Sequence, residues 1–109
     1  MPSVAKQFTM RFIKKEQLKN DVFSFSFDRE ERGLTFLPGH YVQMTLPHEN
    51  SDERGSSRYF TISSSPTEKD YLTITTRVGK SSFKKALFGL QPGTKVQLFG
   101  PMGTFLLPV

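Results

Sequence analysis

The chain contains no cysteine and no tryptophan among its 109 residues. Without thiolates, this segment cannot form disulfides, hold zinc through cysteine or ligate an iron–sulfur cluster. Histidine is scarce too, and neither His40 nor His48 has a second metal ligand at a useful spacing. No metal site is therefore expected in this segment.

Long apolar runs are also absent. No stretch approaches the roughly 18 residues that a membrane-spanning helix requires, and no secretory signal pattern opens the chain. We therefore expect a cytoplasmic protein with no membrane segment in this chain. If the full-length protein has a membrane segment elsewhere, the expected place is the cytoplasmic face of that membrane.

Phenylalanine and positive charge are what the chain has in excess. It carries 11 Phe and 3 Tyr, and its 15 Lys and Arg outnumber 10 Asp and Glu, for a formal net charge of +5. A basic balance fits a phosphate-bearing ligand or an acidic protein partner, with solubility alone as the alternative. The basic residues are scattered along the sequence and form no stripe interleaved with aromatics, which argues against a nucleic-acid partner.

Apolar and polar residues alternate in six short segments, as they do in half-buried strands. The one helix signal is Phe83–Phe88, with Ser81 or Ser82 as its N-cap and Gly89 at its end. One domain over residues 1–109 is predicted, with an all-β fold: a six-stranded antiparallel Greek-key barrel with one short α-helix before the last strand. A sandwich is the alternative. The predicted strands cover 6–12, 23–27, 41–46, 57 onward, 72–77 and 95–99, and 13–20 is predicted to be a polar connection.

The fourth predicted strand opens with Arg58-Tyr59-Phe60-Thr61, and a run of serines follows it up to Pro66. An arginine presents a planar fork of donors suited to phosphate oxygens. An aromatic face can lie against a flat heterocycle, and a threonine hydroxyl can bond a ring nitrogen. The cluster therefore suits a flavin nucleotide, and an ordinary strand end at a barrel rim is the alternative.

Gly79-Lys80-Ser81-Ser82 precedes the predicted helix. Its plain interpretation is a glycine turn followed by an N-cap. Its functional interpretation is an anion site, because exposed amides, a lysine and two hydroxyls gather where a helix begins. We expect this segment and Arg58 to hold one diphosphate from two sides.

Four motifs in this order resemble those of the flavin-binding (FAD-binding FR-type) barrel domain of the ferredoxin–NADP(+) reductase superfamily. Arg58-Tyr59-Phe60-Thr61 with Ser65-Pro66 is similar to the family's Arg-x-Tyr-Ser/Thr and Ser-Pro. Pro38-Gly39 resembles the proline-glycine before the third strand, and Gly79 to Ser82 resembles the Gly-x-x-Ser that grips the pyrophosphate. Gly100-Pro101-Met102-Gly103-Thr104-Phe105 is similar to the motif that closes the barrel. The resemblance covers nearly the whole chain.

The resemblance also implies roles for individual residues. Arg58 would pair with the flavin phosphate, Phe60 would take the place of the ring-covering tyrosine, and Thr61 would bond the redox-active edge of the ring. Because Phe60 lacks the tyrosine hydroxyl, one hydrogen bond worth on the order of 1 kcal/mol should be missing. No catalytic residue is predicted. The predicted cofactor-binding residues are Arg58, Tyr59, Phe60, Thr61, Thr75, Thr76, Arg77, Lys80, Ser81 and Ser82.

By this resemblance the chain would be the FAD-binding half of an NAD(P)H-dependent flavin oxidoreductase that passes electrons to an acceptor. FAD is favoured over FMN because the helix start suits a second phosphate. An NAD(P)-binding domain is expected in cis, downstream of Val109, and residues 1–109 alone should be nearly inactive. Two alternatives stay open: a flavin-storage or partner-docking barrel without catalysis, and a basic barrel that binds single-stranded nucleic acid.

Overall fold

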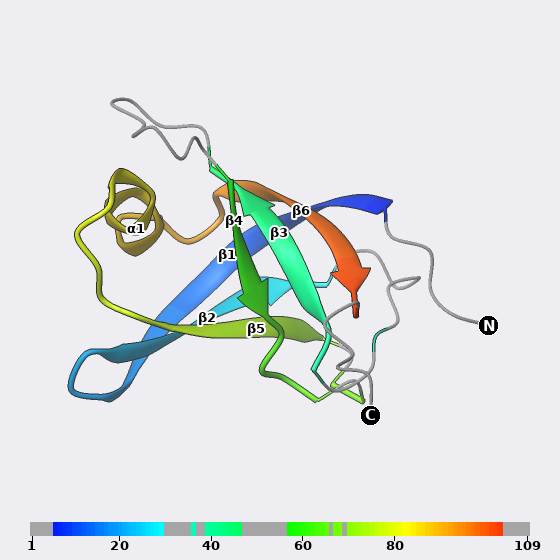
Figure 1. Ribbon diagram of the computed structural model, residues 1–109, viewed down its shortest axis with the longest axis horizontal. Helices are drawn as coiled ribbons and strands as arrows, with labels where there is room; N and C mark the ends of the chain where they lie inside the picture. The colour runs from blue at the N-terminus through cyan, green and yellow to red at the C-terminus, as the bar shows by residue number, and fades with distance from the viewer. Residues whose placement is uncertain are drawn as a thin grey trace.

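The computed structural model describes residues 6–29, 36, 39–46, 57–65, 67–68 and 70–103. Six strands and one helix lie in these ranges (Figure 1). No helix among the described residues is long and apolar enough to cross a membrane. The elements in chain order are β1 (Lys6–Lys19), β2 (Val22–Asp28), β3 (Tyr41–Thr45), β4 (Ser57–Thr61), β5 (Tyr71–Arg77), α1 (Ser82–Phe88) and β6 (Lys95–Met102).

All six strands form one antiparallel sheet in the order β4-β3-β6-β1-β2-β5. The last strand, β6, returns to lie between β1 and β3, which is the kind of return that defines a Greek key. The prediction of an all-β fold with six antiparallel strands and one short helix before the last strand is confirmed. The sheet curls on itself, but among the described residues no continuous ladder closes it.

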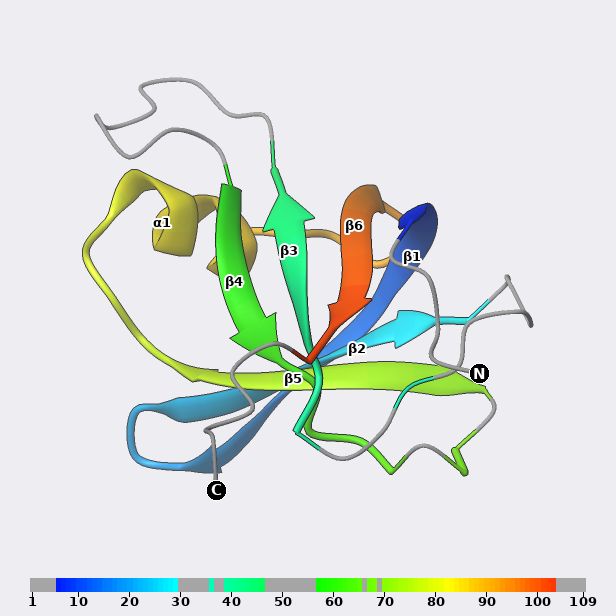
Figure 2. The same ribbon diagram turned by 45° about the vertical axis from the view of Figure 1, so that its right-hand side comes forward.

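The two edge strands, β4 and β5, approach each other at one end only. An isolated bridge joins Ile62 to Ile74, and the amide of Ser63 donates to the carbonyl of Thr73 at 2.8 Å. Beyond this point β4 and β5 diverge, and α1 lies beside the gap that opens between them (Figure 2). This opening is called the seam below.

Two strands are longer than predicted. Residues 13–20 were expected to be a polar connection, but β1 continues to Lys19 and pairs with β2. A register shift between Phe12 and Lys14 breaks the alternation there, and the polar residues that follow extend the hairpin past the core. Strand β6 continues through Gly100 to Met102, beyond the predicted end of the strand at residue 99. A Cβ at Gly100 would lie 3.1 Å from the carbonyl oxygen of Tyr41, so glycine allows β3 to approach closely.

The core lies inside the curled sheet and is closed at one end by α1. Phe83 and Leu87 of α1 are fully buried, and the Phe88 ring packs edge-on against Phe23 and Phe25 at 5.2 and 5.0 Å. The Lys15 ammonium donates to the Phe88 carbonyl at 3.1 Å, which ties the end of the helix to the β1–β2 hairpin. The start of α1 is thereby held beside the seam.

Candidate functional site

A cavity of about 590 Å³ lies at the seam. Its size falls in the range typical of small-molecule and cofactor pockets, roughly 300–1,000 Å³. Three elements far apart in the sequence contribute to it: the edge strand β4, the end of β5 and the beginning of α1. The lining residues are Ser57, Arg58, Tyr59, Phe60, Thr76, Ser81 and Lys84.

Arg58 is a buried cation at this cavity. Burial alternates along β4, so Arg58 and Phe60 face inward while Tyr59 faces out. The Arg58 side chain is only 9% exposed. Its guanidinium carbon lies 5.3 Å from the centre of the Phe83 ring, and Nη1 donates to the Ser57 carbonyl at 2.8 Å. Stacking on the first turn of α1 holds the charged fork at the cavity, where it could pair with an anion.

The two aromatic residues of β4 have different surroundings. Phe60 is 9% exposed and its ring centre lies 5.8 Å from that of Phe83, so most of its surface belongs to the core. Tyr59 is 61% exposed, and its ring meets Tyr41 edge-on at 5.7 Å. Both line the cavity. The cavity is therefore lined by one aromatic side chain from each face of β4.

The free edge of β4 turns backbone groups toward the seam. The Ile62 amide donates to the His40 carbonyl at 2.9 Å, on the β3 side. Because peptide groups alternate along an antiparallel strand, the amides of Tyr59 and Thr61 point the other way. The Ser63 amide, next in that series, does bond β5 through the Thr73 carbonyl. The seam is thus lined by main-chain donors and acceptors as well as by side chains.

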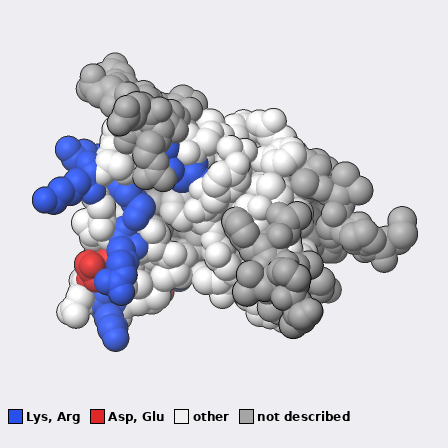
Figure 3. Space-filling model, in the orientation of Figure 1, with Lys and Arg blue, Asp and Glu red and all other residues white. Residues whose placement is uncertain are grey.

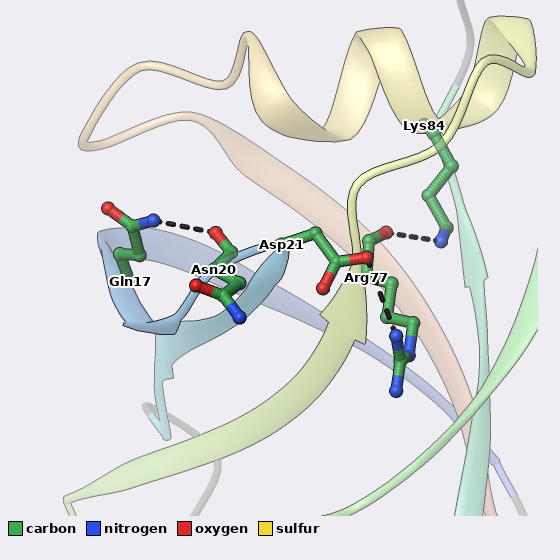
Figure 4. Close-up of polar contacts among 5 residues, drawn as sticks. All are labelled: Gln17, Asn20, Asp21, Arg77 and Lys84. Carbon is green, nitrogen blue, oxygen red and sulfur yellow. Dashed lines mark hydrogen bonds and ion pairs between the residues drawn. The ribbon is translucent and has the colours of Figure 1, made fainter.

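Ser81 and Lys84 contribute the helix side of the cavity. Ser81 is the N-cap of α1, and its Oγ accepts from the Lys84 amide at 3.1 Å. A hydroxyl that accepts one bond still has its own proton to donate. The Lys84 ammonium donates to the Arg77 carbonyl at 2.6 Å (Figure 4). Burial lowers the pKa of Lys84 below its ordinary value, because a partly desolvated ammonium is less stable.

The predicted site residues divide into two groups. Arg58, Tyr59, Phe60, Thr76 and Ser81 line the cavity together. The other five do not line it: the Thr75 hydroxyl donates to Ser63 at 2.9 Å, and Arg77 pairs with Asp21 at 3.4 Å on the exposed hairpin side (Figure 4). Residues outside the lining are Thr61, Thr75, Arg77, Lys80 and Ser82.

Ser57 and Lys84 line the cavity, and the sequence analysis missed both. Lys84 could have been found, because side chains on a helix lean toward its N-terminus. A lysine three residues after the N-cap therefore reaches back to the helix start. Ser57 carries no comparable signal. It is the first residue of an edge strand, and only the position of the seam brings it to the site.

Positive charge gathers on one side of the molecule. Lys and Arg side chains that are scattered in the sequence gather on the side of the molecule that carries α1 and the β1–β2 hairpin (Figure 3). Among the described residues no cluster of three or more His, Asp or Glu could hold a metal ion. Several positions of the predicted motifs, among them Pro38, Pro66 and Phe105, lie outside the described residues.

The cavity at the seam combines cations, which suit phosphate, with aromatic faces, which suit a flat ring. The chain matches the family described as Oxidoreductase FAD-binding domain over residues 9–106, and it belongs to that family. The expectation of an FAD-binding domain is thereby confirmed at the level of the family. Among curated protein sequences, none matches this chain.

Solved structures of several reductases share the fold. The Amycolatopsis cytochrome P450 reductase GcoB superposes with a TM-score of 0.78 at 24% identity, over 95% of this chain and 30% of its own. The cytochrome b5 reductase domain of Ulva prolifera nitrate reductase gives 0.71 at 19% identity, over 89% and 41%. Ferredoxin-NADP+ reductase from Plasmodium falciparum gives 0.68 at 19%, over 94% and 42%. This chain spans less than half the length of each of these proteins.

Proposed function

We propose that this chain binds FAD in the seam cavity and is the flavin-binding half of an NAD(P)H-dependent oxidoreductase. The observation that carries the proposal is that one cavity joins Arg58 of β4 to Ser81 at the start of α1. These are the two segments expected to hold one diphosphate, and they come from separate parts of the chain. The donor set also fits FAD, because cations and hydroxyls suit phosphate while aromatic faces suit the flat ring.

Arg58 would hold the diphosphate as its principal charged contact. Its guanidinium is already oriented by Phe83 and the Ser57 carbonyl, so little conformational entropy is lost when an anion binds. The hydroxyls of Ser57, Thr76 and Ser81 line the same cavity and would donate to phosphate or ribityl oxygens. Two further sets of residues are proposed near this path: Thr75 and Arg77 at the end of β5, and Lys80 and Ser82 around the helix start.

The isoalloxazine ring would lie along the free edge of β4. Phe60 and Thr61 point to opposite faces of this strand, so one ring can contact both only if it lies along the edge between them. There the backbone amides of Tyr59 and Thr61 would donate to the polar rim of the ring. Thr61 would supply its hydroxyl at the redox-active edge. The part of the Phe60 ring that the core leaves open would contact the face of the isoalloxazine. Tyr59 would flank the isoalloxazine from the exposed side.

When bound, FAD supplies the redox chemistry, accepting an electron pair and releasing it to an acceptor. An NAD(P)-binding domain in cis would bring the reduced nicotinamide to the ring. This part of the proposal is supported by the greater length of the three related proteins, of which the chain spans 30%, 41% and 42%. The acceptor would be a protein or a small molecule bound by the complete enzyme.

The test is an FAD titration of the purified chain, followed by flavin fluorescence, with the Arg58→Ala variant beside it. The wild-type chain is expected to bind saturably, and Arg58→Ala to bind at least tenfold more weakly, because a charge-assisted hydrogen bond is worth about 1.5–3 kcal/mol. Arg11→Ala is the control, an exposed arginine of β1 away from the cavity lining. A folded wild-type chain that does not bind FAD contradicts the proposal, as does Arg58→Ala binding as tightly as Arg11→Ala.

The same samples separate the alternatives. Oligonucleotide binding without FAD binding would identify a nucleic-acid barrel. FAD binding by a full-length protein without a nicotinamide-binding domain would identify a storage or docking module.

A further inference from the structure

The side chain of Lys84, which lines the cavity, packs closely against Gly79. A Cβ placed on Gly79 would come within 2.8 Å of the Lys84 Cγ and 3.4 Å of its Cβ. The first of these distances is shorter than real side chains allow, and both atoms are close to the Lys84 backbone, where the chain cannot simply swing away. Any larger residue at position 79 must therefore move Lys84. Glycine here makes room for a lysine side chain.

The far end of the same side chain is also fixed. The Lys84 ammonium donates to the carbonyl of Arg77 at 2.6 Å (Figure 4). The backbone amide of Lys84 donates to the Ser81 hydroxyl at 3.1 Å. The side chain thus bridges the connection between β5 and α1, and Lys84 lines the same cavity as Arg58. An ammonium has three donors, and the bond to Arg77 uses one of them.

We propose that Lys84 is the second cationic contact for the diphosphate of the bound dinucleotide, and that Gly79 is present to seat Lys84. This inference rests on the proposed FAD binding and assigns a role to two residues beyond it. It shifts the lysine contact from Lys80, which lies outside the cavity lining, to Lys84, which lies in it. In this assignment Gly79 leaves space for the Lys84 side chain.

Charge balance supports this assignment. An FAD diphosphate carries two negative charges, and Arg58 supplies one positive charge from the β4 side. Lys84 supplies another from the α1 side of the same cavity. Partial burial lowers the pKa of Lys84 in the absence of an anion, and a phosphate beside the ammonium would raise that pKa again because it favours the charged form. Binding would thus relieve a desolvation cost.

The first experiment compares FAD dissociation constants of Lys84→Met and Lys85→Met. The two lysines are adjacent on α1, and only Lys84 lines the cavity. We expect Lys84→Met to weaken FAD binding about tenfold, as the loss of one charge-assisted contact implies, and Lys85→Met to leave it unchanged. Lys84→Arg should recover most of the affinity. Equal affinities for the two Met variants would overturn the proposal.

Ionic strength provides the readout that a purely structural role would not change. Salt screens a charge–phosphate contact, so FAD affinity of the wild-type chain should fall as salt is raised. In Lys84→Met this fall should be shallower, whereas in Lys85→Met it should match the wild type. An unaltered salt dependence in Lys84→Met would show that the residue contributes packing and no phosphate contact.

The second experiment tests whether Gly79 acts through Lys84. Gly79→Ala should weaken FAD binding to a similar degree as Lys84→Met. The double variant should be little worse than either single variant, because both remove the same contact. Effects that multiply would refute the coupling. If the wild-type chain binds FAD but these variants bind it equally well, this inference fails and the proposed function stands. If the folded wild-type chain does not bind FAD, the proposed function itself fails.

Discussion

At the residue scale, the two neighbouring aromatics of β4 differ in what they contribute. Phe60 packs against Phe83 and is 9% exposed, whereas Tyr59 is 61% exposed. Phe60 therefore supports the fold and the cavity wall together. Tyr59 is available to a ligand at little cost to the core.

This difference predicts opposite responses to truncation. Phe60→Ala should lower the free energy of unfolding by about 2–4 kcal/mol, somewhat less than a fully buried phenylalanine would lose at a central position. Tyr59→Ala should change it by less than about 1 kcal/mol, because its ring is mostly in water and makes one edge contact with Tyr41. Urea unfolding of the chain without FAD measures both. A larger loss for Tyr59→Ala than for Phe60→Ala would mean that the Tyr59 ring supports the core.

The residue scale also shows why only part of the site was predictable. Arg58 and Ser81 were found because each belongs to a local pattern, a strand end and a helix cap. Lys84 was missed although its place three residues after the N-cap is a local signal, whereas its contacts with Gly79 and the Arg77 carbonyl depend on how the chain folds between β5 and α1. Ser57 was missed because nothing near it in the sequence indicates that its strand is an edge. Contacts that depend on how elements meet leave no local signal.

At the element scale, α1 combines a structural cap with a surface of the cavity. Ser81 ends the extended chain, caps the helix through the Lys84 amide and lines the cavity. Stability and binding can therefore be separated at this one position by choice of side chain.

Three substitutions of Ser81 make the separation measurable. Ser81→Ala should lower the free energy of unfolding by about 1 kcal/mol through loss of the cap. Ser81→Asn and Ser81→Asp should both preserve stability, since each is a good N-cap. Only Ser81→Asp should weaken FAD binding strongly, because its carboxylate repels phosphate in the same cavity. Thermal unfolding and FAD titration of the three variants test this. Equal FAD affinity for Ser81→Asp and Ser81→Asn would place the diphosphate elsewhere.

The strands show a similar limit of sequence patterns. Alternation identified all six, and it located β2 within a residue because Phe23, Phe25 and Phe27 face one core. It failed over residues 13–20, where the second half of β1 is exposed and held by backbone pairing to β2. Hydrophobic periodicity reports burial on one face, so a hairpin that extends into solvent shows no such pattern.

At the scale of the whole molecule, the open seam connects the fold with the proposed function. A fully closed ladder between β4 and β5 would use the edge groups of β4 for pairing. In this sheet pairing stops near Ile62 and Ile74, and the rest of the edge faces a cavity of about 590 Å³. The sheet thus forgoes some backbone hydrogen bonds between β4 and β5 and leaves a cavity whose volume is typical of cofactor pockets.

The size of that site leads to the last prediction. If FAD occupies the cavity, a nicotinamide nucleotide needs another surface, which the proposal assigns to a second domain. Residues 1–109 with added FAD should therefore bind flavin yet oxidise NADPH or NADH no faster than free FAD does. The measurement is the rate of NAD(P)H absorbance loss at saturating FAD, with the Arg58→Ala variant as a control for cofactor binding. Turnover at ordinary enzymatic rates, about 1–1,000 per second, that is lost in Arg58→Ala would contradict the assignment of nicotinamide binding to a second domain. It would mean that the seam alone brings nicotinamide and flavin together.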